Sequence, residues 1–307
     1  MGDITDRHYS EESIFININE TDKLHLKRIF TNPDGPPVLL VHGSIENGKI
    51  FYSSSGKGLA PYLALCGFDV FVADLRGRGL STPAIGRGSD HGLSNIISED
   101  IPAFYNKIKE IKGSIPQHWI AHSWGGVVYL AYLAKNPDHV NVASLVLFGS
   151  KRRIGIVSPE RIYLIELLWN LLASLYIKYY GYLPAVKINI GADNETARSH
   201  EETNIWVYSK KWTDWYDEFD YSAALKKIKL PPILVLTGKN DKVLGHPADV
   251  QRLLDEIGDQ DYQFKILSRK NGNLHDYGHV DILTHADAAK DHFPEVVNWM
   301  KSIENSL

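Results

Sequence analysis

The stretch Trp119-Ile120-Ala121-His122-Ser123-Trp124-Gly125-Gly126-Val127 joins an apolar run to a segment of helical character through a single serine. Ala121 and Gly125 flank Ser123 at two residues on either side. Small residues are required there when a strand turns sharply into a helix, because larger side chains would collide with the neighbouring elements. The stretch therefore predicts a strand, a tight turn that carries Ser123, and a helix.

Similar apolar runs recur along the chain, and runs that are apolar on both faces are typical of parallel strands covered by helices. They cover residues 38–41, 70–73, 119–121, 145–148 and 233–236, with helical stretches at 58–66, 97–111 and 127–135 between them. Residues 13–19 and 24–28 alternate apolar with polar side chains, which predicts an antiparallel hairpin at an edge of the sheet. The alternation of strand and helix predicts an α/β fold with a mostly parallel central sheet flanked by helices.

A gap of roughly eighty residues separates the apolar runs at 145–148 and 233–236, which is too long for one crossover between parallel strands. We therefore expect a core domain of residues 1–150 and 229–307, with a helical cap inserted at 151–228. Residues 160–180 are apolar almost all round, apart from a polar stripe of Glu166, Asn170, Ser174 and Lys178. Placing Glu166 in lipid would cost roughly 2 to 3 kcal/mol, so we expect a cap helix packed on the sheet domain, without a transmembrane span. Contact between the cap and a lipid surface stays open.

An aromatic cluster follows within the insertion, and its role stays open. It comprises Trp206, Tyr208, Trp212, Trp215, Tyr216, Phe219 and Tyr221. These side chains could line a pocket for an acyl or aromatic group, or dock the cap on the core.

Composition limits the partners and the compartment. The formal net charge of the 307 residues is -4, with acidic and basic residues nearly balanced, so we expect no nucleic-acid partner. Cys66 is the only cysteine, which excludes an intrachain disulfide and a cysteine-rich metal site. The first residues are acidic and lack the apolar run of a secretory signal, so we expect a cytoplasmic protein. The oligomeric state stays open.

The turn at Ser123 predicts a nucleophile elbow, in which the serine hydroxyl projects into a site. The backbone N–H of Trp124 would lie at the start of the following helix, where an anion is favoured, and would supply half of an oxyanion hole. The loop Val41-His42-Gly43-Ser44 follows an earlier strand, and we assign the second donor to the backbone N–H of Ser44. We expect His42 and Gly43 to support this loop, with His42 ordering it through hydrogen bonds.

The general base and its carboxylate are expected in the C-terminal third. Asp241 follows the apolar run at 233–236, where a carboxylate could orient a histidine and stabilise its imidazolium. Among thirteen histidines, His279 lies in a loop between the predicted last strand near residues 264–267 and the final helix. A histidine suits the role because its ordinary pKa lies near 6.5. His275 is the alternative base, and Asp241 serving only in a turn is the alternative for the acid.

Together these features resemble the α/β-hydrolase superfamily over nearly the whole chain, including the order Ser, Asp, His. The turn Asp74-Leu75-Arg76-Gly77-Arg78-Gly79-Leu80-Ser81 adds to the resemblance. Some members carry the acid after the strand that here ends near Phe148, but Gly149-Ser150-Lys151 offers no carboxylate, which favours Asp241. Gly278-His279-Val280-Asp281 and the segment 293–299 resemble acid-lipase-like members, which implies that Asp281 orders the loop of His279.

This resemblance and the residues imply a serine carboxylester hydrolase, esterase-like or lipase-like, that acts through an acyl-enzyme on an ester with an apolar acyl or aromatic part. No cofactor and no metal are expected, and the partner is a small-molecule ester. Dehalogenases and epoxide hydrolases need an aspartate at the position of Ser123. Proline iminopeptidases share a Ser-Trp-Gly elbow, but their Gly-Gly-Pro loop is missing at Ser44-Ile45-Glu46. Such a peptidase, another acyl hydrolase such as a thioesterase or a C–C hydrolase, and a catalytically silent ligand binder are the alternatives.

Overall fold

The computed structural model describes residues 8–306 and contains one eight-stranded sheet with the strand order β1-β2-β4-β3-β5-β6-β9-β10. The six strands from β4 to β10 pair in parallel, whereas β1 and β2 run antiparallel at one edge. The fold is thus the predicted α/β type, and β1 and β2 form the predicted edge hairpin. The strands are β1 Ser10–Asn17, β2 Lys23–Phe30, β3 Pro37–Val41, β4 Asp69–Asp74, β5 Gln117–His122, β6 Val142–Phe148, β9 Ile233–Gly238 and β10 Tyr262–Leu267.

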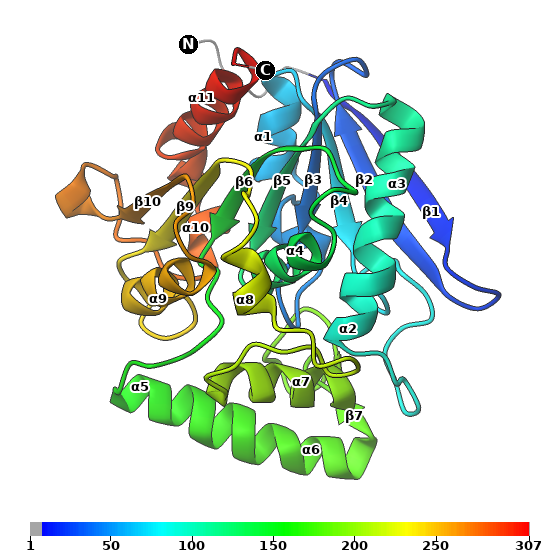
Figure 1. Cartoon of the computed structure of the whole chain (residues 1–307), viewed down its shortest axis with the longest axis vertical. Coiled ribbons are helices and arrows are strands. Elements are labelled where there is room, and N and C mark those ends of the chain that lie inside the picture. The colour runs from blue at the N-terminus through cyan, green and yellow to red at the C-terminus, as the bar shows by residue number, and fades with distance from the viewer. Residues whose placement is uncertain (1–7, 307) are drawn as a thin grey trace.

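Helices cover both faces of the sheet (Figure 1). Successive strand residues point to opposite faces, so Leu39 and Val41 of β3 join one core cluster while Val38 and Leu40 join the other. This explains why β3 is apolar at every position. The first face carries α2 Leu93–Asn95, α3 Ile101–Lys112, α4 Trp124–Lys135, α8 Tyr221–Leu225 and α9 Pro247–Ile257; the second carries α1 Leu59–Leu65, α10 Asp281–Thr284 and α11 Phe293–Glu304.

Two helices begin earlier in the chain than the sequence predicted. A π-helical turn, η3 Ile96–Asp100, joins α2 to α3, so helical structure starts before residue 97. The helix expected at 127–135 begins at Trp124, directly after the serine. Short 3-10 turns occur at η2 Gly48–Ile50, η5 Arg269–Asn271 and η6 Ala286–Lys290.

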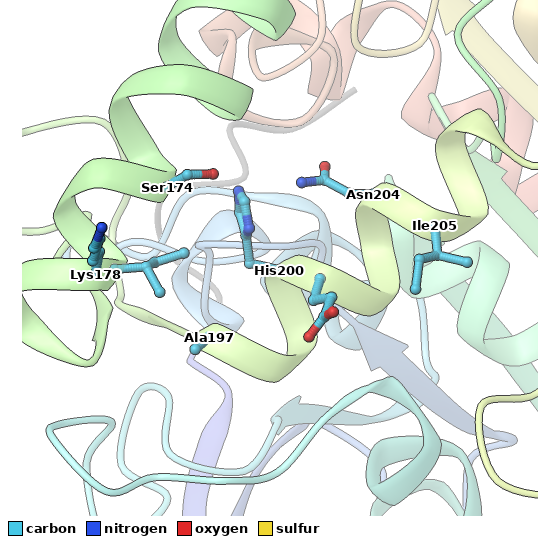
Figure 2. A pocket seen from close by; sticks show the side chains of 8 residues that line it. Ser174, Lys178, Ala197, His200, Asn204 and Ile205 are labelled. Carbon is cyan, nitrogen blue, oxygen red and sulfur yellow. The ribbon is translucent and has the colours of Figure 1, made fainter.

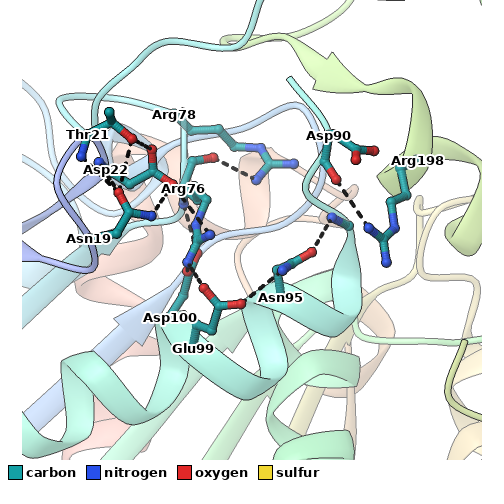
Figure 3. Close-up of polar contacts among 11 residues, drawn as sticks. Asn19, Thr21, Asp22, Arg76, Arg78, Asp90, Asn95, Glu99, Asp100 and Arg198 are labelled. Atoms are coloured by element: carbon teal, nitrogen blue, oxygen red, sulfur yellow. Dashed lines mark hydrogen bonds and ion pairs between the residues drawn. The ribbon is translucent and has the colours of Figure 1, made fainter. Parts of the chain in front are cut away.

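Buried ion pairs of two arginines hold the turn that follows β4. Arg76 donates hydrogen bonds to both carboxylate oxygens of Asp100 and pairs with Glu99 (Figure 3). Arg78 pairs with Glu195 of the segment between β6 and β9, and both side chains are almost fully buried. Breaking one partner of such a buried pair is costly, so these contacts anchor that segment to the sheet.

Three helical units lie between β6 and β9: two of them lie beyond the carboxyl ends of the strands, and the third, α8, packs against α4 (Figure 1). The first is a continuous helix made of α5 Pro159–Arg161, the π-helical η4 Ile162–Leu172 and α6 Ala173–Tyr180; α7 Ala197–Tyr208 and α8 follow. Two short strands, β7 Tyr182–Leu183 and β8 Glu195–Thr196, pair antiparallel before α7. Loops at the ends of β3 and β4 contact this segment, since Asn47 and the Gly79 N–H both donate to Asp193.

The helix Pro159–Tyr180 packs on α7 and not on the sheet, which differs from our expectation. Asn170 of its polar stripe donates to Tyr208 of α7, and Trp169 donates to Asn204 of α7. The opposite face is apolar and exposed, with Ile162, Tyr163, Leu167, Leu171, Leu175 and Tyr179 each more than one third accessible. Among the described residues this is the one helix long and apolar enough to cross a membrane, with a mean hydropathy of 1.2 over its most apolar part.

The aromatic cluster mainly docks the insertion on the core. Trp206, Trp212 and Tyr221 are buried against one another, with ring centroids 5.5 to 5.8 Å apart. Trp206 also lies 6.3 Å from the ring of Trp124 at the start of α4. The exposed Trp215 and Tyr216 take no part in this packing.

Candidate active site

Ser123 sits in the sharp turn between β5 and α4 with φ 52° and ψ −122°, a conformation that residues with side chains seldom adopt. Close packing imposes it: a β-carbon on Gly125 would lie 2.5 Å from the carbonyl oxygen of Val41. The Ser123 N–H is tied to the carbonyl of Phe148 at 2.8 Å. Because Gly125 has no side chain, α4 can start directly against β3. The Ser123 side chain projects from this turn, and the residue is 9% exposed.

Three side chains from distant segments meet at this turn. His279 Nε2 lies 2.9 Å from Ser123 Oγ, and His279 Nδ1 lies 2.6 Å from Asp241 Oδ2. With the proton on Nδ1 donated to the carboxylate, Nε2 can accept the serine proton. The structure thus brings together the three residues that the sequence singled out for nucleophile, base and acid.

Asp241 is suited to remain an anion. Burial raises the pKa of its carboxyl, but the charge of His279 and its hydrogen bond outweigh this, helped by the Gly245 N–H and the charge of Lys151, so that the pKa lies below its usual value. Asp241 is only 3% exposed. An ionised carboxylate here fixes the histidine tautomer and would stabilise an imidazolium.

The loops of Asp241 and His279 are held together by backbone contacts. The Asn240 N–H donates to the carbonyl of Tyr277 at 2.7 Å, and a β-carbon on Gly238 would come within 2.0 Å of that same oxygen. The Gly278 N–H is satisfied by Asp281. This last contact is the kind that we expected of a residue ordering the loop of His279.

The candidate oxyanion donors lie on either side of the serine. A β-carbon on Gly43 would lie 2.8 Å from Ser123 Cβ and 3.3 Å from Ser123 Oγ, so the loop that carries Ser44 is pressed against the nucleophile. The backbone N–H groups of Trp124 and Ser44 have no acceptor within residues 8–306. Unpaired backbone donors beside a serine are what an oxyanion hole requires.

His42 makes contacts that suit a loop-ordering residue. Its Nδ1–H donates to the carbonyl of Gly43 at 2.8 Å, and its Nε2 accepts the N–H of Leu75 at 3.1 Å. Burial, with the nearby charge of Arg78, lowers the pKa of His42, which keeps the ring neutral as these two bonds require.

Three ionisable groups beside the triad were not singled out in the sequence. Lys151 is 4% exposed and its Nζ lies 5.4 Å from the ring centroid of Trp124. Burial lowers the pKa of Lys151 to about 8 against the charges of Asp241 and Asp249. Glu46 and His122 form a second hydrogen-bonded pair next to Ser123. No sequence pattern marks these residues, although His122 directly precedes the serine.

His275, the alternative base, lies elsewhere. Its Nε2 pairs with Asp287 at 2.8 Å, and its ring lies 4.1 Å from that of His285. Within residues 8–306 these three residues are the group whose ligand atoms lie close enough to hold a metal ion. They make no contact with the triad, so they offer no direct part in its chemistry.

Two cavities lie away from the triad. One, of about 370 Å³, runs between α6 and α7 and is lined by Ser174, Lys178, His200 and Asn204 (Figure 2). The other, of about 490 Å³, lies beside Arg76, Arg87 and His91. Ser123, His279 and Asp241 line neither of them.

Residues 36–160 match the family model described as the alpha/beta hydrolase fold. The chain is 24% identical to a monoglyceride lipase of Saccharomyces cerevisiae over 256 residues, which cover 77% of each protein. It also superposes on a thermophilic esterase from Thermogutta terrifontis, with 19% identity, a TM-score of 0.57 and coverage of 95% of this chain and 99% of the esterase. A further similar structure is the 2-hydroxy-6-oxo-6-phenylhexa-2,4-dienoate hydrolase from Rhodococcus sp. strain RHA1, with 18% identity, a TM-score of 0.60 and coverage of 95% and 99%. The sheet order, the sharp turn at Ser123 and these similarities show that the chain has the α/β-hydrolase fold.

Proposed function

We propose that this protein is a serine carboxylester hydrolase that works through an acyl-enzyme. The observation that carries the proposal is the continuous chain of hydrogen bonds from Ser123 Oγ through His279 to Asp241 Oδ2. Such a chain raises the nucleophilicity of a serine whose hydroxyl is otherwise a weak nucleophile. The similarity to a yeast monoglyceride lipase supports an ester as the substrate.

In the proposed reaction, Ser123 Oγ bonds to the ester carbonyl carbon while its proton passes to His279 Nε2. The carbonyl oxygen becomes an oxyanion that accepts hydrogen bonds from the backbone N–H groups of Trp124 and Ser44. When the intermediate collapses, the carbon–alkoxy bond breaks and His279 returns the proton to the departing alcohol. Water, deprotonated by His279, then attacks the acyl-enzyme, and the acid leaves as Ser123 regains its proton.

The test is hydrolysis of p-nitrophenyl butyrate by Ser123→Ala, with Ser54→Ala at an exposed serine as the matched control. Losing the nucleophile of such a triad costs about 10⁶ in rate, so activity should fall to background. The control should stay within about twofold, because surface substitutions have small effects. Turnover by purified Ser123→Ala at more than about 10⁻² of the wild-type rate would overturn the proposal.

Labelling with a fluorophosphonate separates this enzyme from a silent binder, because only an activated serine reacts quickly. Wild-type protein should be labelled and Ser123→Ala should not. A folded wild-type protein that resists labelling would favour the ligand binder. Activity on a peptide with an N-terminal proline, or on a thioester, that exceeds activity on every ester tested would favour the peptidase or thioesterase alternative.

We also propose that the exposed face of the helix Pro159–Tyr180 contacts a lipid surface. Asn170 and Glu166 of its polar stripe contact Tyr208 of α7, and the face turned away from α7 exposes apolar side chains where a solvated helix would present polar ones. This arrangement favours long-chain over short-chain esters.

The lipid proposal can be tested with Leu171→Glu, and with Ile115→Glu as a control at an exposed apolar residue outside the insertion. Leu171→Glu should reduce co-sedimentation with phosphatidylcholine vesicles and hydrolysis of a dispersed long-chain ester, but not hydrolysis of soluble butyrate. If both variants bind vesicles as the wild type does, this face has another role.

A further inference from the structure

A second pair, the buried His122 and the partly buried Glu46, lies beside the triad. His122 Nδ1 lies 2.8 Å from Glu46 Oε2, and His122 Nε2 lies 2.9 Å from the carbonyl oxygen of His279. The same Glu46 oxygen accepts the N–H of Gly43 at 2.8 Å. One pair therefore joins the loop of the base, the turn of the nucleophile and the loop of the second oxyanion donor.

The charge state of His122 follows from its two partners. A neutral imidazole has one N–H and one lone pair, but here both ring nitrogens face oxygen acceptors. A carbonyl oxygen can only accept, so Nε2 must carry a proton. Glu46 already accepts the Gly43 N–H with the same oxygen, so a second proton is best placed on Nδ1.

The surrounding charges favour the same state. Burial lowers the pKa of His122, but the charge and hydrogen bond of Glu46, then the carbonyl of His279 and the charge of Asp241, outweigh burial and raise the pKa overall. Burial likewise raises the pKa of Glu46, while the charges of His122 and His279 and the Gly43 N–H bring it down to about 2. The ring of His279 faces that of His122 at 4.7 Å between centroids. Glu46, Asp241 and His279 are therefore the charged or titratable groups around this ring.

We propose that His122 is a buried imidazolium ion, neutralised by Glu46, and that this pair positions His279 and the Gly43 loop relative to Ser123. His122 does not touch the reacting atoms, so it is a positioning residue; its effect on rate rests on the proposed function. The hydrogen bond from His122 holds the backbone of His279. It thereby determines the position of His279 Nε2 relative to Ser123 Oγ. Small errors in that geometry are costly, up to about 10² in rate for about 1 Å.

The charge state can be measured without activity. In nitrogen-15-labelled protein at pH 7, the His122 ring should show protons on both nitrogens, with assignment from the signals lost in His122→Asn. Glu46→Gln removes the counterion, so His122 should then carry one ring proton at the same pH. A wild-type His122 with a single ring proton at pH 7 would overturn the inference, whether or not the protein hydrolyses esters.

The positioning role can be tested with two matched substitutions. In His122→Asn the side-chain amide replaces Nδ1 and can still reach Glu46, but it cannot reach the carbonyl of His279. In His122→Gln the amide replaces Nε2 and can reach that carbonyl, but it leaves Glu46 without its partner. We expect His122→Asn to lower kcat about 10- to 100-fold with KM changed less than about threefold, because no substrate contact is lost. His122→Gln should retain more of kcat than His122→Asn.

The pH profile gives an independent reading. At a pH above the raised pKa of His122, the ring loses one proton and the nitrogen's lone pair then faces an oxygen acceptor. The wild-type kcat should therefore fall reversibly on the alkaline side. In Glu46→Gln this alkaline fall should move to lower pH. If both His122 variants keep wild-type kcat and the wild-type alkaline profile, the pair has no positioning role, while loss of activity in Ser123→Ala would still support the proposed hydrolase.

Discussion

Replacing Asp241 with Asn tests whether the carboxylate sets the tautomer of His279. The two side chains have the same shape, so packing in this buried position is preserved. An amide, however, offers one oxygen where the carboxylate offers two. In the wild type the carboxylate accepts both His279 Nδ1–H and the Gly245 N–H.

Either orientation of the amide harms the reaction. If its NH₂ group faces His279, Nδ1 must accept, the ring proton moves to Nε2, and Nε2 can no longer take the proton of Ser123. If its oxygen faces Nδ1, the tautomer is preserved but the negative charge that stabilises the imidazolium is lost. The 2.6 Å contact places that charge directly against the ring. Loss of the correct tautomer in a Ser-His-Asp triad costs about 10⁴, or about 5 kcal/mol of transition-state stabilisation.

The assay is kcat/KM for p-nitrophenyl butyrate at pH 7, together with the rate of fluorophosphonate labelling. Both should fall by about 10³ to 10⁴ in Asp241→Asn. Asp259→Asn, at an exposed position on the following loop, is the control and should remain near wild type. A loss smaller than about tenfold, with urea unfolding unchanged, would refute the role given to Asp241.

Three further outcomes are expected. Gly43→Ala places a β-carbon 2.8 Å from Ser123 Cβ and should lower kcat/KM at least about 10², measured with the same ester; activity within about threefold of wild type would contradict this. Glu195→Gln leaves the buried guanidinium of Arg78 without its counterion and should lower the free energy of unfolding in urea by about 3 kcal/mol, whereas a change below about 1 kcal/mol would show that the pair is dispensable. His292 is buried and donates a hydrogen bond from Nε2 to the carbonyl of Ile282. Burial lowers the pKa of His292 to about 4, so the folded protein binds fewer protons than the unfolded chain between pH 6.5 and 4. Stability should therefore decline by up to about 3 kcal/mol as the pH falls through that window, and His292→Leu should show a flatter urea-unfolding profile against pH than wild type does.

The strands of the core could be predicted because their environment leaves a direct trace in the sequence. A strand covered by helices on both faces is apolar throughout, and β3, β4, β6 and β9 all show such runs. The helix α9 was not predicted, although one of its faces is buried in the core. Its amphipathic pattern lies directly after the loop of Asp241.

The orientation of the helix Pro159–Tyr180 could not be predicted from its pattern. A narrow polar stripe on an apolar helix is compatible with burial of the apolar face, which is what we expected. In the structure Asn170 and Glu166 of this stripe meet Tyr208 of α7, while Ser174 and Lys178 are exposed. The sequence shows how wide the apolar face is, but the choice of which face turns inward depends on contacts with another helix.

The triad and the buried pair differ in how far sequence could reveal them, and the reason is chemical. Serine at a sharp turn, followed in order by an aspartate and a histidine in loops after late strands, is a combination with few other uses, so position along the chain was informative. Glu46 and His122 are ordinary residue types whose roles arise only from contacts across 76 residues to each other and, from His122, across 157 residues to the carbonyl of His279. A carbonyl group is present in every residue, so its part in holding the base leaves no mark in the sequence. Residues that hold a catalytic backbone in place are for this reason found from coordinates, and here they surround a serine whose own turn was the clearest signal in the chain.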